Sequence, residues 1–444
     1  MTKIKDLIIL FISSLFLFAS AQAMAKTKIT WWNYSSEESG LNADLKSFIQ
    51  DEFNASQDEI ELEIIFKDGD YNDLTRIALI GGVGPDLVSS SGPTYVQAYA
   101  DGGFVLPLDD YSEQYGWKEK LLPWAYEAGV FKGKFYAFPK NYESMLYFYN
   151  KTLFEENGWD LPSNLSEYES LAQKIQDKGM YPFAYGSSGW QPTHEHLVGN
   201  YFNNVAGPDN LYKALIGEKK WTDPEFVQSL ELLNKHMMDG YWSGGLDNYY
   251  SVGWDEMFFQ FVNREAAMMQ IGTWGFGDTS GGFAEKSDDW GWAPLPNLTN
   301  EGGNPNYQLS VGGAMSINSA SKNPDAAAAV LDWIISDKAR VLELTAARNY
   351  GEWLMPLKYE ASDFSADVDQ RIKDYLIDFA DRTGKGDYGY TTWTYYPGAA
   401  NEHLYKSMEE VWAGSITIAE YLEEQQALWD EARSSGSVSP IGQR

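Results

Sequence analysis

Hydrophobic residues recur with two different periods at the start of the chain. Residues 29–32 and 60–66 form β-rich or alternating runs, whereas residues 41–53 and 71–80 place apolar side chains three and four positions apart. Glycines and a proline at 81–85 end the second helical pattern before a short strand pattern at 86–88. The order strand, helix, strand, helix, strand predicts a doubly wound, mainly parallel α/β sheet.

The middle of the chain has a more helical pattern, with amphipathic stretches at 222–238 and 255–269. A strand pattern returns at 312–317, and a helix is expected to begin at Asn323-Pro324-Asp325, because proline fits the first helical turn. Chain crossings after Pro139, at 298–306 and at 349–356 predict two discontinuous lobes. We expect residues 26–139 and 306–350 in lobe 1, and residues 140–305 and 351–444 in lobe 2.

The N-terminus is typical of a cleaved secretory signal over residues 1–25. Lys3 and Lys5 precede an apolar run at 7–18, and Ala23-Met24-Ala25 supplies small residues around a cleavage site. This run is shorter than the roughly 20 residues that span a bilayer. The chain has no cysteine, which excludes disulfides, a thiol nucleophile and a lipidated cysteine anchor. We therefore expect a freely soluble periplasmic protein.

Composition narrows the kind of ligand. The net charge of −31 disfavours nucleic acid and anionic membranes as partners. The chain contains 17 Trp, 29 Tyr and 22 Phe, and a sugar cleft needs aromatic platforms surrounded by polar groups. Lys140 and Arg348 are the main cations near the expected cleft, so a neutral ligand is favoured over an acidic one.

Residues 132–158 carry the clearest motif. Ala137-Phe138-Pro139, followed by Tyr149-Asn150-Lys151, resembles the interdomain crossover of family 1 extracellular solute-binding proteins, the maltose-binding-protein-like carriers of ABC sugar importers. Other segments resemble the same family in the same order along the chain: Gly84-Pro85-Asp86-Leu87-Val88, residues 102–109, Ala266-Ala267-Met268, Gly272-Thr273-Trp274, Gly312-Gly313 and residues 413–417.

The resemblance implies the two-lobed periplasmic binding protein fold of type II, with a doubly wound sheet in each lobe and a ligand between the lobes. It also implies a non-enzymatic monomer without cofactor that delivers its ligand to a membrane permease with a separate ATPase. No phosphate-binding loop motif occurs in the sequence, which agrees with that division.

Candidate ligand-binding residues follow from two arguments. Ligands of doubly wound sheets lie at the carboxyl ends of strands, which selects residues after the first strand, after the third strand and beyond the crossover. The resemblance implies that the Trp274 indole stacks on the sugar and that the Glu143 carboxylate accepts sugar hydroxyls. Trp190 lies in a Gly/Ser-rich loop, and Trp393 and Tyr395 belong to a cluster expected to be exposed. The full candidate set is Trp32, Asn33, Tyr34, Glu37, Ser90, Tyr142, Glu143, Trp190, Trp254, Trp274, Gly313, Trp353, Trp393 and Tyr395.

One departure from the family limits the choice of sugar. The maltose-binding branch carries tryptophan, aspartate and arginine after the third strand, whereas this chain has Ser89-Ser90-Ser91-Gly92-Pro93-Thr94. This difference argues against maltodextrin and leaves the sugar unnamed.

Three other interpretations stay open. The same fold could carry a peptide or a polyamine. A secreted glycoside hydrolase would need two carboxylates, for which Glu37, Glu38, Glu143 and Glu195 are available. His194-Glu195-His196 suggests zinc, but histidines two positions apart diverge on a helix, so no metal is expected.

Overall fold

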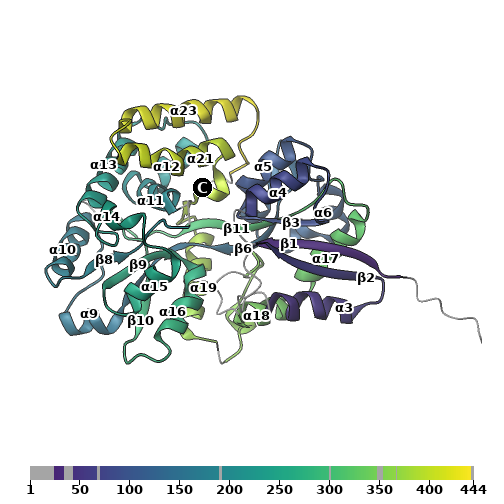
Figure 1. The fold of residues 1–444 in the computed structure, drawn as a ribbon, viewed down its shortest axis with the longest axis horizontal. Helices are drawn as coiled ribbons and strands as arrows, with labels where there is room; N and C mark the ends of the chain where they lie inside the picture. Colours follow the sequence, from purple (N-terminus) through teal and green to yellow (C-terminus); the bar gives the residue numbers. More distant parts are fainter. Residues whose placement is uncertain are drawn as a thin grey trace, which may run out of the picture.

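The computed structural model describes residues 25–34, 44–67, 71–189, 193–299, 302–347, 354–366 and 368–441. The chain folds into two lobes, each built on its own sheet and covered by helices (Figure 1). This architecture confirms the predicted two-lobed α/β fold. None of the helices in these ranges combines the length and the apolar character needed to cross a membrane.

Lobe 1 contains the sheet with strand order β12-β11-β3-β1-β2, in which β6 also pairs with β11. β1 runs parallel to β2 and β3, which confirms the parallel sheet predicted for the start of the chain. The strands are β1 (Thr27–Tyr34), β2 (Ile60–Lys67), β3 (Leu87–Ser90), β6 (Phe138–Glu143), β11 (Gln308–Ile317) and β12 (Gly389–Tyr390), with β4 (Val130–Phe131) and β5 (Lys134–Phe135) forming a separate hairpin.

The helices of lobe 1 bury apolar faces against this sheet. A helical segment at Lys46–Asp51 continues directly into the first of them. They are α3 (Glu52–Ser56), α4 (Tyr71–Ile80), α5 (Pro93–Asp101), α6 (Asp109–Tyr115), α7 (Trp117–Lys120), α8 (Pro123–Ala128), α17 (Pro324–Ser336) and α18 (Lys338–Ala347). As the sequence predicts, α17 begins with Pro324 in its first turn.

Lobe 2 contains the sheet with order β10-β7-β9-β8, formed by β7 (Met145–Asn150), β8 (Tyr181–Ala184), β9 (Ala266–Gly272) and β10 (Trp290–Pro294). A mainly parallel sheet was expected here, and that detail is wrong. Only the β8–β9 pair is parallel, whereas β7 runs antiparallel to β9 and β10. β7 follows β6 after a single residue, so the path of the chain out of lobe 1 sets the direction in which β7 runs.

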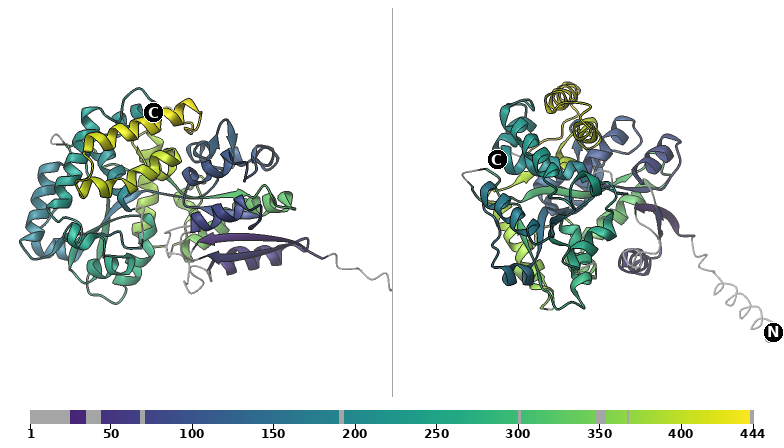
Figure 2. Two further views of the ribbon diagram at one scale, coloured as in Figure 1. Left: turned by 45° about the horizontal axis from the view of Figure 1, so that its top comes forward. Right: turned by 60° about the vertical axis from the view of Figure 1, so that its left-hand side comes forward.

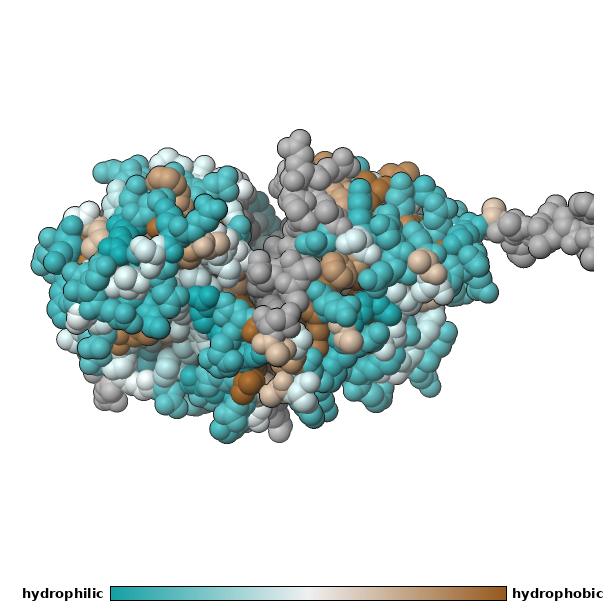
Figure 3. All heavy atoms as spheres, turned by 90° about the horizontal axis from the view of Figure 1, so that it is seen from below, coloured by the Kyte–Doolittle hydropathy of each residue, from teal (hydrophilic) through white to brown (hydrophobic). Residues whose placement is uncertain are grey.

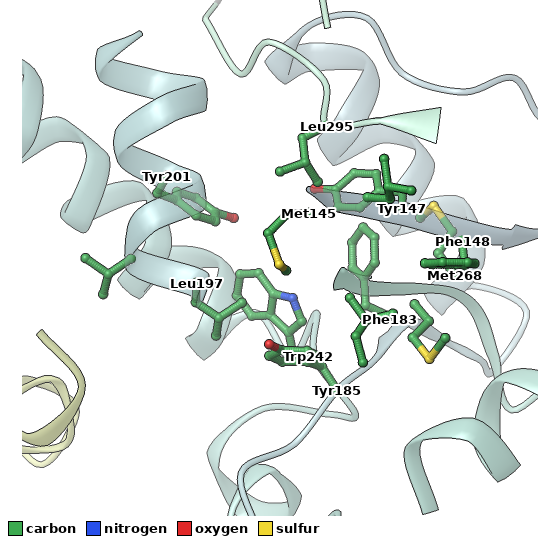
Figure 4. Close-up of a cluster of buried hydrophobic side chains, with 14 of the residues drawn as sticks. Met145, Tyr147, Phe148, Phe183, Tyr185, Leu197, Tyr201, Trp242, Met268 and Leu295 are labelled. Carbon is green, nitrogen blue, oxygen red and sulfur yellow. The ribbon is translucent and has the colours of Figure 1, made fainter. Parts of the chain in front are cut away.

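Helices surround the sheet of lobe 2, and the C-terminal ones form an outer layer that packs on other helices (Figure 2). They are α9 (Lys151–Asn157), α10 (Leu165–Gln176), α11 (Thr193–Tyr201), α12 (Pro208–Leu215), α13 (Pro224–Met238), α14 (Leu246–Tyr249), α15 (Trp254–Val262), α16 (Phe276–Phe283), α19 (Gln370–Gly384), α20 (Thr392–Tyr395), α21 (Gly398–Lys406), α22 (Met408–Trp412) and α23 (Ile418–Ser434). The core between sheet and helices is aromatic: Tyr147, Phe183, Tyr201 and Trp242 pack together with the Met145 side chain (Figure 4).

The helix expected at 255–269 is wrong in its second half. α15 ends at Val262, Arg264 takes a left-handed φ of 63°, and β9 begins at Ala266. Every residue of β9 is buried, because the strand lies between β7 and β8. A strand buried on both faces has no alternating pattern, so its apolar run cannot be separated from a helix by periodicity.

β6 and β11 form the central connection between the lobes (Figure 1). Ser144 alone separates β6 from β7, and the first residues of β11 pair with β12 before its remainder joins β3. The expected boundary at residue 139 therefore falls inside β6. The third crossing was expected at 349–356, and its residues 349–353 lie outside the described residues. Just after them, the Leu354 carbonyl accepts a hydrogen bond from the Tyr142 amide at 2.9 Å.

Candidate ligand-binding site

Polar side chains at the carboxyl ends of β1 and β3 form a buried network. Asn33 Oδ1 accepts hydrogen bonds from Ser89 Oγ at 3.0 Å and from Lys140 Nζ at 3.1 Å. Trp31 Nε1 donates to Ser89 Oγ at 2.8 Å. Asn33, Ser89 and Lys140 are all buried, so each needs these partners. The network joins β1 and β3 to the hinge strand β6.

Trp32 lies on the other face of β1 from Trp31 and Asn33, because side chains alternate along a strand. The Lys67 ammonium lies 4.5 Å from the centroid of its ring. The structure therefore separates Trp32 from the Asn33 network. Tyr34 ends β1, and its side chain lies outside the described part of the structure.

Glu143 lies at the end of β6 with only 5% of its surface exposed. Its carboxylate accepts hydrogen bonds from Asn141 Nδ2 at 3.3 Å and from Ser310 Oγ at 3.5 Å. Asn141 Oδ1 is buried beside it and accepts no hydrogen bond from the described part of the chain. A ligand hydroxyl is the kind of group that such an acceptor requires.

Gly312 and Gly313 make room for these side chains. A Cβ atom at Gly312 would lie 1.9 Å from Glu143 Oε1, and one at Gly313 would lie 2.9 Å from Asn141 Oδ1. Neither glycine is in the left-handed region, so close approach, rather than backbone strain, requires them.

Two tryptophans of lobe 2 and a histidine form an aromatic cluster. The Trp274 and Trp393 ring centroids lie 5.9 Å apart in an edge-to-face arrangement. His196 lies 5.5 Å from Trp274 and 4.8 Å from Trp393. The Trp274 side chain stays half-buried and folds back over Gly272. A half-exposed indole held by its neighbours is suited to stacking on a flat apolar ligand face.

Hydrogen bonds at the hinge join the segments that carry the aromatic cluster to the strands that carry Glu143 and Gly312. The Thr273 amide, next to Trp274, donates to the Ser144 carbonyl, next to Glu143, at 3.0 Å. Thr394, next to Trp393, accepts from the Val311 amide at 2.9 Å, and Gly312 follows Val311. These bonds join the segments that carry Glu143, Trp274, Gly313 and Trp393, and the Lys140 side chain links Asn33 to the same hinge strand β6.

The C-terminal residues of this cluster also contact lobe 1. A Cβ atom at Gly92 would lie 2.6 Å from the Trp393 carbonyl oxygen, and Thr94 Oγ1 donates to the Tyr396 carbonyl at 2.8 Å. Helix α20 packs on both α5 and β11. The two lobes are therefore in direct contact beside the candidate site.

The expectation that Trp393 and Tyr395 are exposed is wrong. They are 4% and 3% exposed, and neighbouring Tyr396 is 2% exposed. Tyr395 packs edge-to-face on Tyr390 at 5.1 Å, inside lobe 2. The segment before Pro397 has the composition of a surface turn, but it forms α20 and fills the space between β11 and α5.

The other predicted residues that the structure describes contact neighbouring protein groups. Tyr142 stacks on Phe379 at 5.4 Å, and burial raises the pKa of its hydroxyl. Trp254 contacts Phe258 at the start of α15, and Ser90 Oγ donates to the Gly92 carbonyl at 3.0 Å. Candidates that fall outside the described residues are Glu37, Trp190 and Trp353, together with Arg348 and Glu38.

Sequence reasoning did not predict that Glu195 is buried. Its side chain, on α11, is 2% exposed and accepts a hydrogen bond from Thr392 Oγ1 at 3.1 Å. Burial raises the pKa of its carboxyl to about 8. The next residue, His196, shares a 2.9 Å hydrogen bond with the Tyr185 hydroxyl through Nδ1. In the described residues no group of three or more His, Cys, Asp or Glu side chains could hold a metal ion, and the side chain of His194 lies outside them.

The Glu195 carboxyl is expected to make stability fall as pH rises. Its folded-state pKa of about 8 lies above the ordinary 4.5, so the folded protein keeps a proton that the unfolded chain releases between these values. Unfolding in urea at pH 5 and pH 8 should show that Glu195→Gln gains on the order of 3 kcal/mol over wild type at pH 8 and little at pH 5. Glu231→Gln, on the exposed face of α13, should retain the wild-type pH dependence. Equal behaviour of the two variants would contradict the assignment.

The fold and this site define a class of protein: two lobes joined by hinge strands, with aromatic and polar side chains from both lobes meeting at the hinge. A family model described as "Bacterial extracellular solute-binding protein" matches residues 35–341. The chain belongs to this family of bacterial extracellular solute-binding proteins.

Curated relatives include the diacetylchitobiose binding protein NgcE of Streptomyces coelicolor, which is 30% identical over 171 residues. That match covers 36% of each chain. The maltotriose-binding protein of Pyrococcus abyssi is 24% identical, with 65% of this chain and 59% of that protein covered. The matches thus span from about a third to three fifths of these relatives.

Solved structures share the fold. A chitin oligosaccharide binding protein superposes with a TM-score of 0.74 at 19% identity, covering 92% of this chain and 99% of the other. The GacH receptor of Streptomyces glaucescens gives a TM-score of 0.69 at 20% identity, with coverages of 93% and 98%.

Proposed function

We propose that this protein is the periplasmic substrate-binding component of an ABC transporter. It binds a neutral di- or oligosaccharide between its lobes and delivers it to a membrane permease with a separate ATPase. The observation that carries the proposal is the Trp274–Trp393 pair, whose segment is hydrogen-bonded through Thr273 and Ser144 to the end of the hinge strand that carries the buried Glu143. An indole face suits the C–H face of a pyranose ring, and a buried carboxylate suits its hydroxyls.

Two of the relatives support this ligand class, because their names specify diacetylchitobiose and maltotriose, and the name of a solved structure specifies chitin oligosaccharide. Relatives from Brucella are named instead for sn-glycerol-3-phosphate. Diacetylchitobiose and maltotriose are therefore the first sugars to test. A peptide or polyamine carrier is the alternative, and glycoside hydrolysis is a weaker one. We further propose that the mature protein acts as a monomer, that it catalyses no reaction, and that residues 1–25 are cleaved without attachment of a lipid.

Ligand capture requires the lobes to move about β6 and β11. The sugar first contacts the Trp274 side of lobe 2, and the lobe 1 network at Asn33 then closes over it. Closure removes water from around the sugar and adds contacts from lobe 1 to those from lobe 2, so affinity depends on both lobes. The closed shape presents surfaces of both lobes to the permease.

A thermal-shift screen of the mature protein tests the proposal. Binding to the native state at a ligand concentration of 100 Kd adds about 2.7 kcal/mol to the free energy of unfolding, which raises the midpoint measurably. We expect one class among chito-, malto- and other oligosaccharides to raise it, with dipeptides, spermidine and amino acids as controls. A rise with peptides or spermidine alone would overturn the sugar assignment, and release of reducing ends would support a hydrolase.

A further inference from the structure

The aromatic cluster of the candidate site is supported from inside lobe 2. The face of the molecule seen in Figure 3 is mainly hydrophilic, with apolar atoms gathered beside the boundary between the lobes. Trp393 and His196 lie beneath the surface, at 4% and 5% exposed, and Trp274 is half-buried. The position of the exposed part of Trp274 therefore depends on the protein groups packed behind it.

His196 is one of these groups. Its ring lies 5.5 Å from the Trp274 ring and 4.8 Å from the Trp393 ring, in tilted and edge-to-face arrangements. Its Nδ1 atom shares a 2.9 Å hydrogen bond with the hydroxyl of Tyr185, a fully buried residue directly after β8. This bond joins the imidazole to the core of lobe 2, so His196 supports both indoles from a fixed position.

Glu195, the preceding residue of α11, holds the segment that carries Trp393. Its Oε2 atom accepts a hydrogen bond from Thr392 Oγ1 at 3.1 Å, and the Asn401 side chain of α21 is hydrogen-bonded to the same carboxyl. One turn further along α11, a Cβ atom at Gly199 would lie 3.1 Å from Thr392 Cγ2, so the two helices approach closely there. α20 has only four residues, and a helix this short depends on tertiary contacts rather than on its own backbone bonds.

We propose that Glu195 and His196 are positioning residues for the sugar, an inference that rests on the proposed interlobe sugar site. His196 sets the arrangement of the two indoles, and Glu195 sets the place of α20 against α11. Together they fix the tilt of the Trp274 face, and a pyranose ring makes full contact with an indole only when the two faces are parallel. Sugar affinity therefore depends on side chains that act through Trp274 and Trp393.

Calorimetry of the mature protein with diacetylchitobiose and maltotriose as probes tests the effect on affinity. His196→Ala should raise Kd by about tenfold, because both indoles lose a ring contact. Thr392→Val keeps the shape of the side chain but removes its hydroxyl, and should raise Kd by about three- to tenfold. Thr392→Ser keeps the hydroxyl and should bring Kd back to within about twofold of wild type. The matched control is His403→Ala on α21, which should bind as wild type does, because His403 packs on Tyr421 instead.

A double-mutant cycle separates positioning from general destabilisation. In the Trp274→Ala background, His196→Ala should change Kd by less than about twofold, because the face that it positions is absent. Effects of the two substitutions that simply add would contradict the proposal, since residues that act through one another are not independent.

NMR spectra of the mature protein, with ¹⁵N in its tryptophan indoles, test the positioning without a sugar. Loss of one signal in each of Trp274→Phe, Trp393→Phe and Trp333→Phe assigns the three indoles. In Thr392→Val the Trp274 signal, as well as that of the adjacent Trp393, should shift, and Thr392→Ser should restore both. The signal of Trp333, which packs on Phe53 in lobe 1, should stay in place.

The two measurements have different consequences. An unmoved Trp274 signal in Thr392→Val, an unchanged Kd in His196→Ala and Thr392→Val, or an equal loss of affinity in His403→Ala would overturn the positioning role. Failure of the wild-type protein to bind any sugar would overturn the proposed function instead, and the indole spectra would then decide the positioning by themselves.

Discussion

Trp274→Ala is expected to weaken sugar binding by on the order of 100-fold while the protein stays folded. Burial of an aromatic side chain against an apolar face contributes about 2–3 kcal/mol, and each 1.4 kcal/mol is tenfold in affinity. The Trp274 indole is half-buried and packs edge-to-face on Trp393, so its removal deletes the platform with a modest loss of core contacts. Isothermal titration calorimetry with the sugar identified by the thermal-shift screen measures the change.

The matched control is Trp333→Ala on α17 of lobe 1. Trp333 is also half-buried, and it packs on Phe53 and beneath the Arg340 guanidinium, outside the interlobe cluster. This variant should bind the sugar as wild type does. Equal loss of affinity in both variants would indicate general destabilisation, and no loss in Trp274→Ala would remove Trp274 from the site.

Gly312→Ala is expected to weaken sugar binding by more than tenfold and to lower the free energy of unfolding by about 1–3 kcal/mol. The new Cβ would lie 1.9 Å from Glu143 Oε1, so the carboxylate must move and lose its bonds to Asn141 and Ser310. Loss of hydrogen bonds to a buried carboxylate carries a cost of this size. Urea unfolding measures the stability, and calorimetry measures the affinity.

Gly281→Ala is the matched control for this variant. Its added Cβ meets no atom within 4 Å, and Gly281 is an exposed residue of α16. Alanine is favoured over glycine in a helix, so this variant should be as stable as wild type or slightly more stable. If Gly312→Ala behaved in the same way, Glu143 would not be confined as the structure indicates.

The fold could be predicted from the sequence where the pattern has a distinct period. β1 and β2 were found because buried and less buried residues alternate along them. β3, whose four residues are all buried, was found from the glycines and proline that precede it. β9 was taken for part of a helix because all seven of its residues are buried and no alternation remains. Helix α20 was read as an exposed segment because its short length and the proline after it are typical of turns, and only tertiary packing shows otherwise.

Residues of the candidate site could be predicted where a motif or the end of a strand identifies them, as for Asn33 near the end of β1. Trp274 and Glu143 were chosen from the resemblance, and the structure places them beside one hydrogen bond between Thr273 and Ser144. Pairings between distant segments left no signal, because a partner far along the chain has no fixed spacing. The bond from Lys140 to Asn33 spans 107 residues, and that from Thr392 to Glu195 spans 197.

A crystal structure of the mature protein with its tightest-binding sugar tests the central claim most directly. We expect one sugar ring within van der Waals contact of the Trp274 indole, about 3.5–4 Å away, and a hydroxyl hydrogen-bonded to Glu143. Residues of both lobes should contact the sugar, with β6 and β11 beside it. A sugar bound to one lobe alone, or without contact to Trp274 and Glu143, would contradict the account of an interlobe sugar carrier.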